Sequence, residues 1–109
     1  MLEAIFGNST AEKVLLYLAK NDQSYAQEIT DALGVRLNLV QRQLRRLEDG
    51  GVVAAQPRGR MRFYTLNPRY PFTPELRALL NKALEFTPPR EREKYGPRRN
   101  RPRAAKKLL

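Results

Sequence analysis

The sequence predicts a mainly helical domain that carries one small β-hairpin. Apolar residues recur at helical spacing in four segments of the first 87 residues. Two short runs with strand composition flank a Pro-Arg-Gly-Arg turn at residues 57–60. With 109 residues, the chain has room for one domain with a modest core. The expected order is helix, short strand, helix, helix, two-stranded hairpin, helix (α-β-α-α-β-β-α).

The first helix is expected to begin near Ser9, because residues 9–12 read Ser-Thr-Ala-Glu and fit a capping box. Val14, Leu15 and Leu18 follow at the spacing of one buried helix face. This segment is therefore expected to be a core helix.

A short extended piece is expected at residues 23–25, followed by a second helix over residues 26–33. Gly34 follows directly, and glycine is suited to the left-handed backbone that often ends a helix. A third helix is expected over residues 37–48, ending at the Gly-Gly pair of residues 50–51. Two short amphipathic helices joined by such a turn are typical of a helix-turn-helix.

The third helix has a polar face opposite its apolar one. When Val40, Leu44 and Leu47 face the core, the helical period turns a polar set to solvent. That set is Asn38, Gln41, Arg42, Arg45 and Asp49. Arg can hold the guanine edge and Asn or Gln the adenine edge, so this face could read bases in a major groove. The alternative is an ordinary solvated face.

The hairpin favours the nucleic-acid interpretation of that face. Its strands are expected over residues 52–56 and 61–66, and Arg58, Arg60 and Arg62 cluster around its tip. The nearby aromatic residues fit packing better than base stacking; they are Phe63, Tyr64, Tyr70 and Phe72.

A fourth helix is expected over residues 73–86. Thr73 would cap it, Pro74 suits its first turn, and Glu75 complements the helix dipole. Its wide apolar stripe favours a homodimer interface over packing onto the first helix of the same chain. The stripe consists of Leu76, Leu79, Leu80, Ala83 and Leu84.

Positive charge is concentrated at the C-terminal end. The formal net charge is +10, of which residues 88–109 contribute +7. We therefore expect a folded domain at residues 1–87 and a flexible, disordered basic tail at residues 88–109. The tail could contact DNA phosphates, bind a partner protein or only improve solubility, and the first is favoured.

The absence of Cys and His excludes thiol chemistry, imidazole catalysis and disulfides, and it disfavours metal or redox sensing. The sequence shows no phosphate-binding glycine loop and no joined carboxylate pair suited to acid-base work. No enzyme activity, cofactor or metal is therefore expected. The N-terminus lacks signal-peptide features, and a cytoplasmic, nucleoid-associated protein is expected.

Over about residues 5–86 the sequence resembles winged helix-turn-helix regulators of the broad ArsR/MarR type. The residues that carry the resemblance are Phe6-Gly7, Ala32-Leu33-Gly34-Val35, Val40-Gln41-Arg42-Gln43-Leu44, Leu47-Glu48 and Arg62-Phe63-Tyr64. The resemblance implies that the third helix enters the major groove and that the hairpin, or wing, touches the adjacent backbone or minor groove. It assigns the groove role to Asn38, Gln41, Arg42 and Arg45, and the wing role to Arg58, Arg60 and Arg62.

One position departs from the superfamily pattern. The recognition helix often begins with Ser or Thr, but here Arg36 stands there and has no side-chain oxygen for capping. We expect Arg36 to reach a phosphate instead.

More narrowly, the link at residues 67–72, the Pro74-Glu75-Leu76 helix start and the Arg/Pro tail look like small winged helix proteins often encoded beside nucleotidyltransferase-type toxins. The leading hypothesis is a dimeric, sequence-specific repressor that binds double-stranded DNA. The alternatives are an antitoxin-like module that binds a toxin or other protein and DNA only weakly, and an RNA-associated basic protein. No membrane contact is expected.

Overall fold

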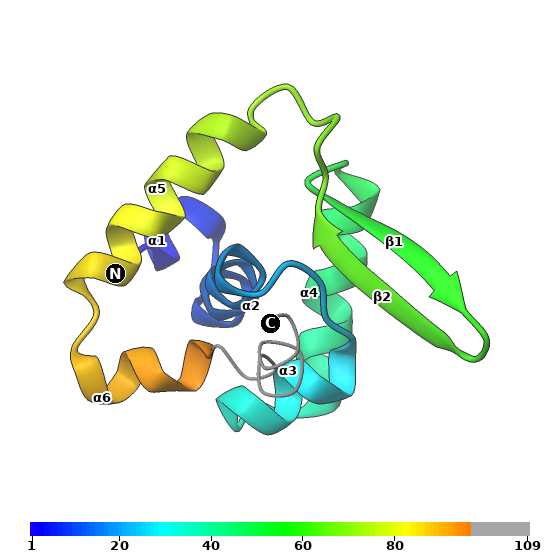
Figure 1. The fold of residues 1–109 in the computed structure, drawn as a ribbon, viewed down its shortest axis with the longest axis horizontal. Helices are drawn as coiled ribbons and strands as arrows, with labels where there is room; N and C mark the ends of the chain where they lie inside the picture. Colours follow the sequence, from blue (N-terminus) through cyan, green and yellow to red (C-terminus); the bar gives the residue numbers. More distant parts are fainter. Residues whose placement is uncertain (97–109) are drawn as a thin grey trace, which may run out of the picture.

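The structure is a computed structural model that describes residues 1–96. Helix α2 lies at its centre, with the helix pair α3 and α4 on one side and the long helix α5 on another (Figure 1). The two-stranded hairpin projects away from α4 (Figure 1). The elements are α1 (Glu3–Phe6), α2 (Ser9–Lys20), α3 (Ala26–Leu33), α4 (Leu37–Asp49), β1 (Val53–Arg58), β2 (Met61–Leu66), α5 (Thr73–Phe86), α6 (Pro89–Arg92) and the 3₁₀ turn η1 (Glu93–Tyr95).

The N-terminal cap of α2 differs from the expected capping box. The cap is Asn8, whose side chain accepts a hydrogen bond from the backbone N–H of Ala11 at 2.7 Å. Glu12 instead accepts from the backbone N–H of Leu2 at 2.9 Å and is largely buried. Asn caps a helix as well as Ser does, so Glu12 is available to hold the short, unexpected helix α1 in place.

The helix-turn-helix forms as predicted. Gly34 ends α3 with left-handed backbone, at φ of 70°. Arg36 is the N-cap of α4 and makes no side-chain cap, as expected for this side chain. Helix α4 extends one residue further than predicted, to Asp49.

The hairpin is antiparallel, with Val53 opposite Leu66 and Arg58 opposite Met61. Ser24 pairs with Tyr64 through N–H···O bonds of 3.0 and 2.7 Å, which confirms the expected extended piece before α3. Strand β1 runs two residues further than predicted and includes Pro57. Because β2 takes the Ser24 bridge, β1 is an edge strand, where proline is tolerated.

Helix α5 has the predicted bounds, but its apolar stripe faces the core of its own chain. Leu80 is fully buried, and Ala83 and Leu84 are almost so, because α5 packs on α2. These three side chains are therefore not available to a partner, contrary to the expected dimer stripe. Leu76 and Leu79 are only half-buried. The expected Thr73 cap is also wrong, since its hydroxyl donates to the backbone oxygen of Asn67.

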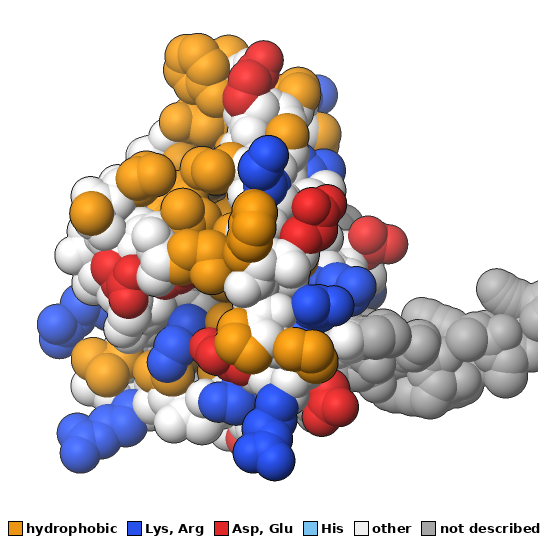
Figure 2. Space-filling model, turned by 90° about the vertical axis from the view of Figure 1, so that its left-hand side faces the viewer, with side chains coloured by type: hydrophobic (Ala, Val, Ile, Leu, Met, Phe, Trp, Pro, Cys, Tyr) orange, Lys and Arg blue, Asp and Glu red, His pale blue; other side chains and the backbone are white. Residues whose placement is uncertain are grey.

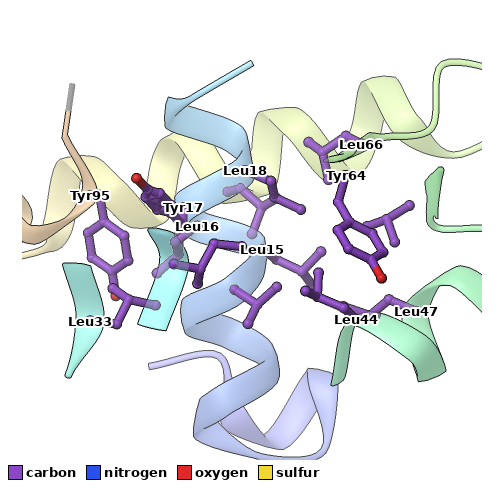
Figure 3. Packing of buried hydrophobic residues seen from close by; sticks show 14 of the residues in the cluster. Leu15, Leu16, Tyr17, Leu18, Leu33, Leu44, Leu47, Tyr64, Leu66 and Tyr95 are labelled. Atoms are coloured by element: carbon purple, nitrogen blue, oxygen red, sulfur yellow. The ribbon is translucent and has the colours of Figure 1, made fainter. Parts of the chain in front are cut away.

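The core joins α2 to every surrounding element. Buried side chains of α2 meet those of α3, α4 and β2 around the central helix (Figure 3). The fully buried side chains of highest volume are Tyr17, Leu15, Leu18, Ile29, Leu44, Leu66 and Leu80.

The folded part extends beyond the expected boundary at residue 87. Helix α6 and turn η1 cover residues 89–95, and Tyr95 is only 2% exposed. The predicted start of the flexible tail at residue 88 is therefore too early, because the buried Tyr95 ties this basic segment to the core. Residues 97–109 lie outside the described residues. None of the helices within residues 1–96 is long and apolar enough to cross a membrane.

Candidate nucleic-acid interface

Helix α4 carries the polar face that the sequence predicted. Its buried side chains face the core, namely Val40, Gln43, Leu44 and Leu47. The five predicted contact residues at its start and along its outer face are all exposed; they are Arg36, Asn38, Gln41, Arg42 and Arg45. Because these side chains are at the surface, their hydrogen-bonding groups can meet a ligand without opening the core.

Arg46 belongs to the same helix but has a structural role. Its Nε donates to Gln43 Oε1 at 3.0 Å, and its Nη2 donates to the backbone oxygen of Phe6 at 2.9 Å. These contacts tie α4 to the C-terminal end of α1.

Arg58 is held against the side of the wing. Its guanidinium carbon lies 4.8 Å from the centroid of the Phe63 ring, and its Nη2 donates to Gln23 Oε1 at 3.2 Å. Phe63 in turn packs edge-on against Tyr25, with 5.4 Å between ring centroids. A cation over an aromatic face is attracted to it, so Arg58 starts from an ordered position.

Most aromatic side chains of this region pack against other residues of the chain, as the sequence predicted. Tyr64 is buried, while Phe63 and Tyr70 are half-buried. Phe72 differs, since 61% of its surface is exposed although its ring contacts Tyr70 edge-on. Packing therefore accounts for three of the four rings.

An ion pair joins the wing to the recognition helix. Arg62 Nη2 lies 2.7 Å from Glu48 Oε2, and both side chains are partly exposed. Hydrogen bonding to Tyr64, and next the charge of Glu48, raise the pKa of Arg62. The sequence did not predict this partner for Glu48. An acid at the end of the recognition helix, shortly before an arginine-bearing strand, is the sequence signal for this pair.

A concave surface lies between α4 and the wing. It encloses about 650 Å³ and has a mixed polar and apolar lining. Its walls are formed by Tyr25, Ala26, Gln41, Arg45, Glu48, Asp49, Arg60, Met61, Arg62 and Tyr64. The structure thus brings two predicted residues of α4 together with two of the wing, while Arg36, Asn38, Arg42 and Arg58 lie outside this lining. Within residues 1–96, no group of three acidic side chains is placed to hold a metal ion.

Residues 2–69 match the family described as sugar-specific transcriptional regulator TrmB. The chain belongs to the TrmB family. The matched residues run from α1 through the wing, so they contain the whole helix-turn-helix and the concave surface. As a TrmB protein, the chain is a DNA-binding transcriptional regulator, and the family is not one of enzymes.

The TrmB match confirms the winged helix-turn-helix regulator expected from the sequence. It does not extend to the narrower ArsR/MarR or toxin-associated resemblances. No curated protein matches the chain.

Proposed function

We propose that this protein is a sequence-specific repressor that binds double-stranded DNA as a homodimer. In this proposal α4 lies in the major groove, and the wing lies on the adjacent backbone or minor groove. The observation that carries the proposal is the exposed Asn-Gln-Arg face of α4 beside an arginine-bearing hairpin.

Three side chains of α4 are the proposed base readers. Asn38 and Gln41 can each donate and accept toward an adenine edge, and Arg42 can donate twice to a guanine edge. All three are exposed. Arg36 stands at the start of the helix, where it would contact a phosphate and orient α4 without reading sequence.

The wing supplies backbone contacts. Arg60 is exposed at the turn of the hairpin, where it can enter a minor groove or meet a phosphate. Arg58 is ordered by Phe63, and Arg62 is paired with Glu48, so these two start from defined positions. We expect Arg60 to contribute more to DNA binding than Arg62, because Arg62 already forms an ion pair with Glu48.

The deciding experiment is genome-wide recovery of bound DNA fragments, followed by affinity measurements on the recovered site. Arg42→Ala should cost about 1–3 kcal/mol on that site and much less on random DNA. Lys82→Ala, on the exposed side of α5, is the matched control and should leave both affinities unchanged. An equal loss on both DNAs would make Arg42 a phosphate contact. Structured RNA that competes as well as the site would refute DNA specificity.

Arg36 has its own test. Arg36→Ala should weaken binding to all DNA sequences alike. It should also reduce the slope of log affinity against log salt concentration by about 0.9, the value for one phosphate contact. Unchanged affinity and salt slope would reject this role.

The proposed dimer contact is an apolar surface formed by α1, α5 and the link between β2 and α5. Its exposed centre is Ile5 at 64% and Phe72 at 61%, and Leu76 and Leu79 lie beside them in a cleft of about 460 Å³. Apolar side chains gather among charges on the face that shows α5 (Figure 2). Both Arg46 and Glu75 line the same cleft, so a two-fold copy could pair opposite charges across it.

Sedimentation measures the dimer directly. The double variant Ile5→Ser/Phe72→Ser should be monomeric at concentrations where the natural chain is dimeric, and Phe86→Ser, which removes another exposed aromatic side chain, is the control. If the natural chain sediments as a monomer both alone and on its site, the dimer is refuted. A dimer would place half-sites about 34 Å apart, or at a multiple of that distance.

Repression is tested with a reporter placed behind the recovered site. A repressor bound there blocks access to the promoter, so the natural chain should lower expression and Arg42→Ala should restore it. Raised expression with the natural chain would make it an activator.

A further inference from the structure

Helix α4 exposes a leucine among its polar and charged side chains. Leu39 is 36% exposed, whereas the other apolar side chains of α4 are half-buried or buried; they are Leu37, Val40, Leu44 and Leu47. The other exposed positions of the helix carry Asn, Gln, Arg and Asp. Single exposed apolar side chains are common on protein surfaces, so the meaning of Leu39 depends on where it lies.

Neither the core nor the proposed dimer contact uses Leu39. It is absent from the buried cluster of the described residues and from the half-buried apolar side chains packed against that cluster. It is also absent from the lining of the apolar cleft that α1 and α5 share. The exposed part of the leucine side chain is therefore available to a ligand of α4.

Leu39 lies in the first turn of α4, next to a proposed base reader. It is the third residue of the helix, and the N-terminal residues of a recognition helix are the ones that contact base edges. Arg42 follows three positions later, which places the two Cβ atoms about 5–6 Å apart on one side of the helix. Base pairs follow one another about every 3.4 Å along a duplex, so side chains at this spacing can meet neighbouring base pairs.

This side of α4 is the one away from the wing. Two predicted residues of α4 line the concave surface beside the wing, but Leu39 and Arg42 do not. Arg46 lies two turns further along the side of Leu39 and donates to the backbone oxygen of Phe6 at 2.9 Å. That bond and the buried side chains of α4 fix the rotation of the helix about its axis, so Leu39 stays beside Arg42.

A leucine can discriminate between bases only through an apolar contact. The apolar group that base edges present in the major groove is the C5 methyl group of thymine. Contact between this methyl group and Leu39 would remove apolar surface of both from water, which is favourable. The polar side chains of α4 gain no such advantage from the methyl group.

We infer that Leu39 is a specificity-determining residue that packs on the methyl group of a thymine, in the base pair next to the one held by Arg42. The inference rests on the proposed function and adds to it a base that the polar readers do not select. It also requires α4 to lie in the major groove, since the minor groove presents no methyl group.

Replacement of thymine by uracil tests the inference, because uracil has the same hydrogen-bonding edge and lacks only the methyl group. The full chain is measured on its recovered site, with each thymine of one half-site replaced in turn. The base pair held by Arg42 is the position at which Arg42→Ala loses its base preference. Uracil in the neighbouring base pair should weaken binding about four-fold, the effect of losing one buried methyl-sized group.

Variants of Leu39 assign the effect to this side chain. Leu39→Ala should bind the thymine and uracil sites equally, whereas Leu39→Met, which keeps a long apolar side chain, should retain most of the difference. Leu39→Gln removes the apolar end of the side chain and should also lose the difference, which covers the case in which Leu39→Ala does not fold. All three replacements are strong helix formers. Phe86→Ala, at an exposed apolar side chain of α5, is the control and should keep the full difference.

The inference is overturned if no thymine next to the Arg42 position is sensitive to replacement by uracil. It is also overturned if Leu39→Ala or Leu39→Gln keeps the full difference, because the methyl group would then act through another residue or through the shape of the DNA. Failure of the proposed function is a different outcome, in which the full chain shows no preference for its recovered site and Arg42→Ala changes nothing.

Discussion

Replacement of Glu48 by Gln tests whether the ion pair with Arg62 holds back a DNA contact. The substitution keeps the size of the side chain and removes its charge, so the Arg62 guanidinium, 2.7 Å away, is released toward the concave surface. The pair is 51% and 30% exposed at its two side chains, and exposed pairs contribute less than about 1 kcal/mol to stability. The melting temperature should therefore change by less than about 8 °C.

The effect on DNA follows from counting phosphate contacts. One additional contact raises the logarithmic salt slope by about 0.9, which makes the affinity advantage of the variant about 3.5-fold greater at 50 mM than at 200 mM salt. Fluorescence anisotropy with a labelled random duplex at both salt concentrations measures this difference.

Glu85→Gln on α5 is the matched control, because it makes the same charge change at another exposed site. If Glu48→Gln and Glu85→Gln give the same slope, Arg62 makes no new contact. If Glu48→Gln weakens binding, the ion pair orients Arg62 for DNA, and the reasoning is refuted.

Three further predictions concern the fold. Gly34→Ala should lower the free energy of unfolding, measured in urea, by about 1–2 kcal/mol. The loss would come from backbone strain alone, because φ is +70° and an added Cβ meets no atom within 4 Å. An unchanged free energy of unfolding would show that the turn relaxes. Leu80→Ala removes a fully buried side chain and should cost about 2–5 kcal/mol, and a loss below 1 kcal/mol would place α5 outside the cooperative core. Burial, followed by the charges of Glu91 and Glu12, raises the pKa of Tyr95 to about 12 from 10.0. The contribution of the buried, neutral Tyr95 to the free energy of unfolding is fully present below pH 10. It is lost as pH rises to about 12, at up to about 1.4 kcal/mol per pH unit, because only the unfolded chain releases the proton in this range. Tyr95→Phe should lack this part of the pH dependence in alkaline unfolding, and identical curves would contradict it.

The local features of the helix-turn-helix could be predicted because they depend on neighbours in the sequence. The period of Val40, Leu44 and Leu47 defines the core face of α4, and the outer face follows from it. Gly34 marks the turn because few other residues adopt its backbone. The strand pairing of the wing follows from two short runs around one turn.

Contacts between segments that are far apart in the sequence were not predicted. Glu12 looked like half of a capping box, but its partner is Leu2, on the other side of α1. The apolar stripe of α5 could pack on a second copy of the chain or on α2, and the periodicity of its apolar residues would be the same in both cases. Packing on α2 decided that Leu80 lies inside the chain.

The sequence alone determined the order of the elements from α2 to α5, the polar outer face of α4 and the excess of positive charge, because propensity, periodicity and composition are properties of neighbouring residues. Tertiary structure alone decided that Glu48 pairs with Arg62 and that Tyr95 is buried beside Leu33. The physical reason is that a charge or a ring has the same local signature whether it stays in water or finds a distant partner. Only the packed chain brings such partners within contact distance.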